Sequence, residues 1–278
     1  MRAENKTNVG QEGFVRLVDT MPSQNLDAAV VQAARISTGA GVKTPDADRS
    51  LIRYLMRNRH TSPFEMVEFK FHLKMPIFIA RQWMRHRMAS INEYSGRYSE
   101  IPDQCYVPKV GDIRTQSAVN KQSSDPVEFP DISAKGFVTA AKSLYDKSYN
   151  AYATAVENGI AREQARVILP QSMYTEFYWK MDLHNFLHFV RLRADAHAQK
   201  EIQDFAQACY DLVRPLVPVC CEAFEDYIKN SMTLSAKEVS ALRKVFKDVK
   251  SIPAPEGLGK TEKAEFAAKI KRLGLTLE

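Results

Sequence analysis

An alternation of apolar and charged side chains constrains the fold of this chain most strongly. In the stretch MVEFKFHLK, residues 66–74, the apolar residues Val67, Phe69, Phe71 and Leu73 alternate with charged or polar residues. A repeat of two is the repeat of a β-strand with one buried face, and a helix cannot bury such a pattern. We therefore predict a strand here, covered on its apolar face by other elements.

Most of the remaining pattern is helical. Apolar spacing and helix-ending residues predict helices at 26–37, 49–60, 77–88, 136–158, 161–169, 183–195 and 197–229. Residues 13–21 and 172–180 are rich in β-branched and aromatic residues and are predicted as further strands. The proline-containing stretch 100–134 is predicted as a long loop. Together these elements indicate an α+β fold.

The domain organisation follows from the composition along the chain. Residues 1–232 are predicted to form one domain, and residues 233–278 a lysine-rich extension that contains a linker at 250–263. The chain has no run of eighteen apolar residues, and its N-terminal residues lack the apolar region of a secretory signal. The four cysteines are expected to be reduced, as in a cytosolic protein.

A dense polar stretch, RHRMASINEYSGR, follows the apolar helix predicted at 77–88. Gln82 and Arg85 are three residues apart and are predicted to share a helix face. Glu93, Ser95 and Arg97 alternate and are predicted to point the same way from an extended segment. An arginine fork beside a hydroxyl suits a phosphate group, and the net charge of +6 favours anionic partners.

A second polar cluster lies on two later helices. Arg162 and Arg166 are predicted to share one face, and His184, His188 and Arg191 to form one stripe. Arg193 points away from that stripe, so it is expected to serve a different part of a ligand or to sit at the border of the helix. Two histidines four apart could bind zinc, but the glutamate that a zinc hydrolase places between them is missing. No metal site is therefore predicted.

Several common catalytic patterns are absent. The sequence has no GxSxG, no GxGxxG and no GxxxxGK[ST], and Cys105 has no neighbouring histidine. A dinucleotide would therefore be held by arginine and histidine side chains rather than by a glycine turn.

The polar stretch closely resembles the signature of flavin-dependent thymidylate synthases, R-H-R-x-x-S-x-x-E-x-S-x-R. Its seven fixed positions are all matched, by Arg85, His86, Arg87, Ser90, Glu93, Ser95 and Arg97. The segments RHTSPFEM, RQW, AREQAR and LRADAHAQ also look like family segments and follow in family order. The resemblance covers about residues 13–230 and leaves the C-terminal extension outside.

The resemblance implies a specific enzyme. Such enzymes are methyltransferases that convert dUMP to dTMP with 5,10-methylenetetrahydrofolate as carbon donor, FAD as redox cofactor and NADPH as reductant, without a cysteine nucleophile. Their fold packs helices on a small, mainly antiparallel sheet. They are cytoplasmic homotetramers with active sites shared between subunits, and neither nucleic acid nor a membrane is an expected partner.

The resemblance also assigns roles to individual positions. The expected catalytic residue is Arg193, at the edge of the uracil ring. The expected dUMP-binding residues are Gln82, Arg85, Glu93, Ser95, Gly96, Arg97, Arg166 and Arg193. The expected FAD-binding residues are Ser37, His60, Ser62, Arg85, His86, Arg87, Glu93, Asp182, His184 and His188. Asp182 and His184 stand where many relatives carry Asn and Arg, and a carboxylate at 182 can accept but not donate hydrogen bonds.

Two other classes of protein remain as alternatives. A flavin-binding protein of the same fold without methylation activity would keep the cofactor residues. A basic nucleic-acid-binding module would explain the net charge of +6, but it would not explain Glu93 among the arginines, because a carboxylate repels phosphate.

Overall fold

One antiparallel sheet organises the protein. The computed structural model describes residues 5–37, 39, 41, 44–118 and 124–278. The sheet has the strand order β1-β2-β3-β7-β4, and every neighbouring pair is antiparallel. Its strands are β1 (Lys6–Val9), β2 (Gly13–Met21), β3 (Glu68–Pro76), β7 (Tyr174–Asp182) and β4 (Ser90–Glu93). The strands predicted from the sequence near 13–21, 66–74 and 172–180 are confirmed.

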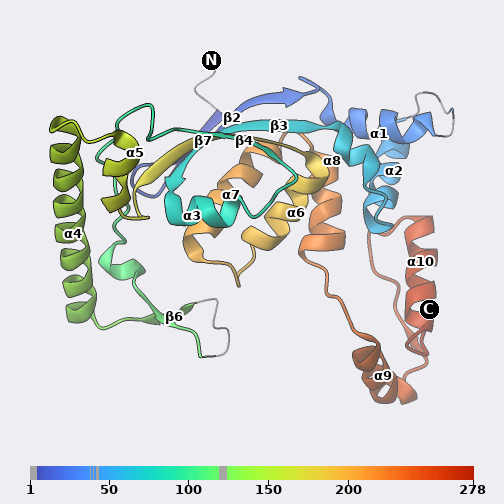
Figure 1. The fold of residues 1–278 in the computed structure, drawn as a ribbon. Helices are drawn as coiled ribbons and strands as arrows, with labels where there is room; N and C mark the ends of the chain where they lie inside the picture. The colour runs from blue at the N-terminus through green and yellow to red at the C-terminus, as the bar shows by residue number, and fades with distance from the viewer. Residues whose placement is uncertain (1–4, 38, 40, 42–43, 119–123) are drawn as a thin grey trace.

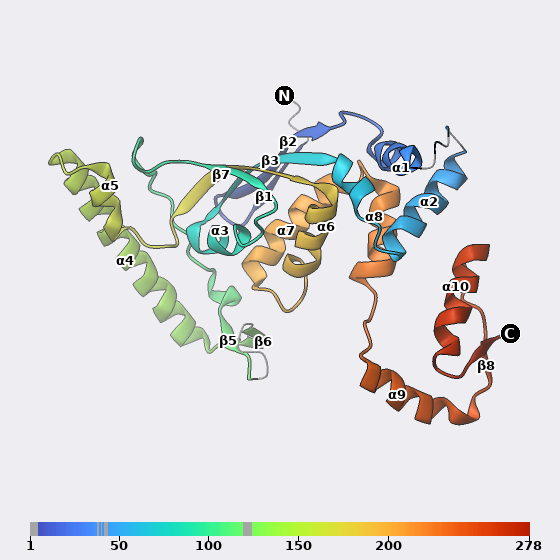
Figure 2. The same cartoon turned by 45° about the vertical axis from the view of Figure 1, so that its right-hand side comes forward.

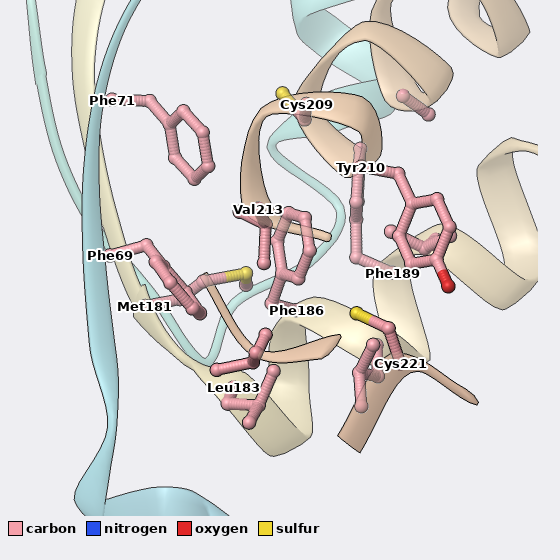
Figure 3. Packing of buried hydrophobic residues seen from close by; sticks show 14 of the residues in the cluster. Phe69, Phe71, Met181, Leu183, Phe186, Phe189, Cys209, Tyr210, Val213 and Cys221 are labelled. Carbon is pink, nitrogen blue, oxygen red and sulfur yellow. The ribbon is translucent and has the colours of Figure 1, made fainter. Parts of the chain in front are cut away.

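The central strands β3 and β7 pair along their whole length, from Glu68 opposite Asp182 to Pro76 opposite Tyr174. The burial of β3 follows the predicted alternation. Phe69, Phe71 and Leu73 are completely buried. In Figure 3, Phe69 and Phe71 project from the sheet toward Phe186 of a covering helix. One face of the sheet therefore supplies one wall of the core.

Four helices cover that face (Figure 1). They are α3 (Ile77–Trp83), α6 (Leu183–Arg193), α7 (Lys200–Val213) and α8 (Pro218–Phe224). Two further helices, α1 (Leu26–Ile36) and α2 (Pro45–Arg57), lie at one end of the sheet. Within the part of the chain that the structure describes, no helix combines the length and hydropathy needed to cross a membrane.

An aromatic cluster joins α3 and α6 to the sheet. Trp83 of α3 contacts Trp179 of β7 and Phe189 of α6, with ring centroids 5.1 and 4.3 Å apart. All three side chains are completely buried. This packing holds the end of α3 and the last turns of α6 against each other, and both of these ends carry candidate site residues.

Two long predicted helices end early or are interrupted in the structure. The helix predicted at 77–88 ends at Trp83, so Arg85 lies beyond it and does not share a helix face with Gln82. The helix predicted at 197–229 is interrupted between α7 and α8, where Pro215 and Pro218 follow each other closely. Proline has no N–H and clashes with the preceding turn, which ends α7. After α8 the chain continues as a π-helix, η5 (Glu225–Lys229).

The segment predicted as a long loop contains regular structure. Strands β5 (Arg114–Gln116) and β6 (Ser124–Glu128) pair antiparallel, and η3 (Val110–Asp112) is a 3₁₀ turn. Helix α4 (Asp131–Glu157) begins five residues before its predicted start. It stands away from the sheet, next to α5 (Arg162–Ala165) and η4 (Arg166–Ile168) (Figures 1 and 2).

The C-terminal residues form a small arm beside α2 (Figure 2). It contains α9 (Ala236–Val245), η6 (Phe246–Asp248) and α10 (Lys260–Lys271). Strands β8 (Ser251–Ile252) and β9 (Thr276–Leu277) pair in parallel. Strand β8 and the start of α10 both lie inside the stretch 250–263 that was predicted as a linker, so that prediction holds only for residues 253–259.

Candidate active site

Arg193, at the C-terminal end of α6, is held by two groups from α3 and the turn that follows it. Its Nε donates a hydrogen bond to Nε2 of His86 at 3.0 Å, and its Nη2 donates to the carbonyl oxygen of Gln82 at 3.4 Å. No described residue accepts a hydrogen bond from Nη1. The guanidinium is therefore anchored on one side and still has donors for a ligand on the other.

The environment of His86 keeps its imidazole neutral at pH 7. Burial, the Arg193 guanidinium and His188 lower the pKa of His86 to about 4. Because Nε2 accepts the hydrogen bond from Arg193, the proton of the neutral ring is on Nδ1. A neutral acceptor beside Arg193 orients this cation without cancelling its charge. Burial also lowers the pKa of Arg193, which nonetheless stays protonated at pH 7.

Arg193 lines a large groove. The groove has a volume of about 840 Å³, and its wall includes Gln82, Gln199 and Lys229. Gln82 Nε2 donates to Gln199 Oε1 at 2.5 Å, which ties α3 to the start of α7. A volume of this size suits a nucleotide-sized or larger ligand. Arg193 thus faces a space in which a substrate could lie.

A smaller cavity of about 60 Å³ lies on the other side of α6. His60, His184 and His188 line it together with Arg59 and Arg191. Arg191 also lines the larger groove, and the rings of His86 and His188 lie 6.2 Å apart. Burial, His184 and Arg191 lower the pKa of His188. The predicted stripe of His184, His188 and Arg191 is therefore confirmed, as is the separate direction of Arg193.

The second half of the signature lies on the sheet edge and in the turn after it. Strand β4 ends at Glu93, whose Oε1 accepts a hydrogen bond from the Thr175 hydroxyl at 2.7 Å. The chain then turns at Ser95, whose carbonyl accepts hydrogen bonds from two following amides. The prediction that Glu93, Ser95 and Arg97 continue one extended alternation is therefore wrong.

That turn lies next to α5 and η4. A Cβ on Gly96 would lie 2.8 Å from Ile101 Cδ1 and 3.5 Å from Arg166 Cδ, so Gly96 permits a close approach. The Arg97 guanidinium lies 3.4 Å from a carboxylate oxygen of Glu163. The structure thus brings Ser95, Gly96, Arg97 and Arg166 together, but this group is separate from Arg193 and its groove.

The other predicted residues differ in their surroundings. Arg85 and Arg87 are exposed, and no described residue forms an ion pair or side-chain hydrogen bond with them. Ser37, which ends α1, and Ser62, which opens the 3₁₀ turn η2 (Ser62–Met66), are also exposed. Asp182 caps α6, and its two carboxylate oxygens accept from the backbone N and Nδ2 of Asn185 at 2.8 and 2.7 Å.

Sequence reasoning did not single out Arg59 or Gln199, although both lie in segments that resemble the family. Arg59 has a backbone φ of 60°, which is unusual for a residue other than glycine. Gln199 is identified as a candidate site residue only by its hydrogen bond with Gln82. Among the described residues, no three His, Cys, Asp or Glu side chains gather as a metal site would require.

Comparison with known proteins supports one family. The model of the thymidylate synthase complementing protein family matches residues 16–219. A flavin-dependent thymidylate synthase from Dictyostelium discoideum is 50% identical, over 86% of this chain and 80% of its own length. One from Treponema denticola is 46% identical over 94% of this chain and 95% of its own length, so that similarity extends beyond residue 232.

A solved structure agrees with these sequence matches. The UMP/dUMP methylase PolB from Streptomyces cacaoi, in a crystal structure with bound 5-Br dUMP, superposes with a TM-score of 0.71 at 34% identity. The superposition covers 80% of this chain and 99% of PolB. With its sheet, its polar signature and these matches, the chain belongs to the family of flavin-dependent thymidylate synthases.

Proposed function

We propose that this protein is a thymidylate synthase that methylates dUMP at C5 of the uracil ring. The carbon would come from 5,10-methylenetetrahydrofolate and the reducing electrons from NADPH through FAD. The observation that carries this proposal is the anchored Arg193 on the wall of the groove of about 840 Å³. No cysteine is required, and burial raises the pKa of Cys209, Cys220 and Cys221.

Arg193 is proposed as the main electrostatic catalyst. Uracil C5 must become electron-rich before it can attack an electrophilic carbon, and the ring then carries negative charge on its oxygen and nitrogen atoms. A cation held at the edge of the ring stabilises this charge, and a preorganised donor costs no reorganisation during the reaction. Neutral His86 keeps the guanidinium in place. Gln82 also lines the groove and is proposed to orient the ring.

The turn after β4 is proposed to hold the phosphate of dUMP. Ser95 offers a hydroxyl, Gly96 lets a ligand approach the backbone, and Arg97 and Arg166 offer guanidinium groups. Together with Arg85 and Glu93, they complete the proposed nucleotide-binding set. Ser95 acts here as a positioning group, because no described histidine is hydrogen-bonded to it as a base would be.

The histidine and arginine side chains on the other side of α6 suit an anionic part of FAD, and the cavity of about 60 Å³ between them holds only a small part of such a ligand. A flavin dinucleotide carries a pyrophosphate, and the small cavity presents His60, His184 and His188 beside Arg59 and Arg191. FAD when bound supplies the redox chemistry of the reaction. The residues proposed to hold it are Ser37, His60, Ser62, Arg85, His86, Arg87, Glu93, His184 and His188. Asp182 is proposed to orient α6 as its cap, because both of its oxygens are already engaged.

We further propose that complete active sites form only in a homotetramer. The phosphate-binding turn lies next to α5 beyond one end of the sheet, whereas Arg193 lies on α6 beneath the sheet (Figure 1). Apolar side chains on α4 are exposed, including Ile132 at 87% and Leu144 at 64%, as is typical of a face covered by another subunit. One subunit could then contribute Arg193 to an active site, and another subunit the phosphate-binding turn.

Hybrid tetramers test this arrangement. Co-expressed Arg193→Ala and Arg166→Ala chains should regain part of the turnover, because some sites would combine the two intact residues. The control pair, Arg193→Ala with Gln82→Ala, should regain no turnover. Arg193 and Gln82 line the groove of the same chain, so every site in this hybrid would lack one of them. Absence of recovery in hybrids verified by native mass spectrometry would contradict a shared site.

The proposed activity is tested first by the visible absorption spectrum of the protein and then by the formation of dTMP. The purified protein should show flavin absorption, NADPH should bleach it faster with dUMP present, and dTMP should form when methylenetetrahydrofolate is added. Flavin without dTMP formation would favour the alternative of a flavoprotein without methylation activity. The four free thiols are consistent with a site of action in the cytoplasm, which is part of the proposal.

A further inference from the structure

The C-terminal arm makes ion pairs with one end of α2. Arg57, the last residue of α2, donates from Nε and Nη2 to the two carboxylate oxygens of Glu265 on α10, at 2.6 and 3.0 Å. One turn earlier, Arg53 Nε donates to Glu262 at 2.8 Å. The hydroxyl of Tyr227 also donates to Glu262. The arginine–glutamate pairs join α2 to α10, two segments about two hundred positions apart in the sequence.

This contact is buried but not densely packed. The side chain of Arg57 is only 6% exposed and that of Glu262 only 12%. A cavity of about 810 Å³ remains between α2 and the segment 255–262 of the arm. Polar contacts, rather than close apolar packing, therefore hold α10 on α2. Bidentate, partly buried pairs of this kind are stronger and more specific in geometry than exposed surface pairs.

The end of α2 that these pairs hold leads directly into the small cavity. Arg59 N donates to Met56 O at 3.2 Å and His60 N donates to Leu55 O at 3.0 Å. With the left-handed φ of 60° at Arg59, this is a Schellman turn. Glycine usually takes that position, because a side chain is disfavoured there. The turn points Arg59 and His60 into the cavity beside His184 and His188.

We propose that Glu262 and Glu265 are positioning residues for the FAD site. Glu265 holds Arg57, and Glu262 shares Arg53 with Glu222 of α8 and Asp226 of η5. Through these pairs the two glutamates help to keep the last turn of α2 in place, and with it the strained Arg59–His60 turn. The C-terminal arm would thus set the affinity for FAD although it lines neither of the two site cavities. This inference rests on the proposed function, in which the small cavity is the flavin side of the active site.

The test uses full-length protein stripped of FAD and titrated with FAD, with binding followed by flavin fluorescence. The double variant Glu262→Gln, Glu265→Gln should raise the Kd about tenfold. The matched control is Glu256→Gln, an exposed glutamate of the same arm that pairs with no described cation, and its Kd should stay at the wild-type value. Hydrogen exchange should show faster exchange of the Arg59 and His60 amides in the double variant only, with unchanged protection of β3 and β7.

Exchanging the charges of Arg57 and Glu265 distinguishes a role in positioning the FAD site from a role in the stability of the whole fold. Arg57→Glu alone should weaken FAD binding, and Arg57→Glu combined with Glu265→Arg should restore most of it. Wild-type protein that binds no FAD would overturn the proposed function and this inference with it. Wild-type binding together with an unchanged Kd in the double glutamine variant would overturn only the inference. Faster exchange across β3 and β7 would also overturn it, since the arm would then support the whole fold.

Discussion

Replacement of His86 by glutamine should reduce the loss of stability that the protein shows on acidification. The glutamine keeps an amide oxygen that can accept the hydrogen bond from Arg193 Nε, but it cannot take up a proton. The change therefore removes one titrating group and retains the contact at 3.0 Å. The effect is expected in the pH dependence of the free energy of unfolding, rather than in its value at neutral pH.

The magnitude follows from the two protonation equilibria. An unfolded histidine has a pKa near 6.5, whereas burial, Arg193 and His188 lower the pKa of folded His86 to about 4. Between these values the unfolded chain binds a proton that the folded protein does not, so stability falls as the pH falls from 6.5 toward 4. At pH 5 a fully shielded group would cost about 2 kcal/mol. Because solvent reaches part of this ring, we expect about 1 kcal/mol.

Urea unfolding of wild type and His86→Gln at pH 7.5 and pH 5 measures this effect. The wild type should lose about 1 kcal/mol more than the variant between the two pH values. His197→Gln is the comparison variant, which removes an exposed imidazole that is hydrogen-bonded to Asp195 at 2.7 Å. An equal loss in wild type and His86→Gln would refute the reasoning, because His86 would then titrate alike in the folded and unfolded states.

Three further predictions concern the sheet, a helix cap and the signature glutamate. Gly13→Ala should destabilise the protein by about 1–3 kcal/mol in thermal unfolding, because its Cβ would lie 2.6 Å from the carbonyl oxygen of Val9. Gly111→Ala, where the space is open, should not destabilise it, and equal effects would contradict the steric argument. Asp182→Ala should cost about 1 kcal/mol through loss of the α6 cap, and Asp182→Asn should recover most of it in the same assay. Thr175→Val should lower kcat/KM for dUMP about tenfold, consistent with loss of one hydrogen bond to a charged group. An unchanged kcat/KM would show that the hydrogen bond from Thr175 to Glu93 does not contribute to catalysis.

The core was largely predictable from the sequence because its signals are local. The alternation in β3 identifies buried Phe69 and Phe71 directly, and the helix predicted at 183–195 begins where α6 begins. Prolines caused most boundary errors in the C-terminal half. The apolar pattern continues through Pro215 and Pro218, although the backbone cannot, so one predicted helix became two helices and a π-helix.

The sequence proposes a set of candidate site residues, but it does not predict how they are arranged. The signature placed Arg85, His86 and Arg87 side by side, and the structure directs them differently: His86 is partly buried against Arg193, whereas its neighbours are exposed. Which of three consecutive residues turns inward depends on where α3 ends. That end is set by packing of Trp83 on Trp179 and Phe189, a contact between distant segments that no local pattern reveals.

The two halves of the signature separate for a topological reason. The first half follows α3, which packs beneath the sheet, and the second half lies on β4, which pairs with β7 at the sheet edge. Glu93 is opposite Phe177, five residues before Asp182, and five residues of strand span about 17 Å. The edge position of β4 thus carries Ser95, Gly96 and Arg97 away from the start of α6. A contiguous motif can therefore serve two different active sites, which is the arrangement that the hybrid tetramers test.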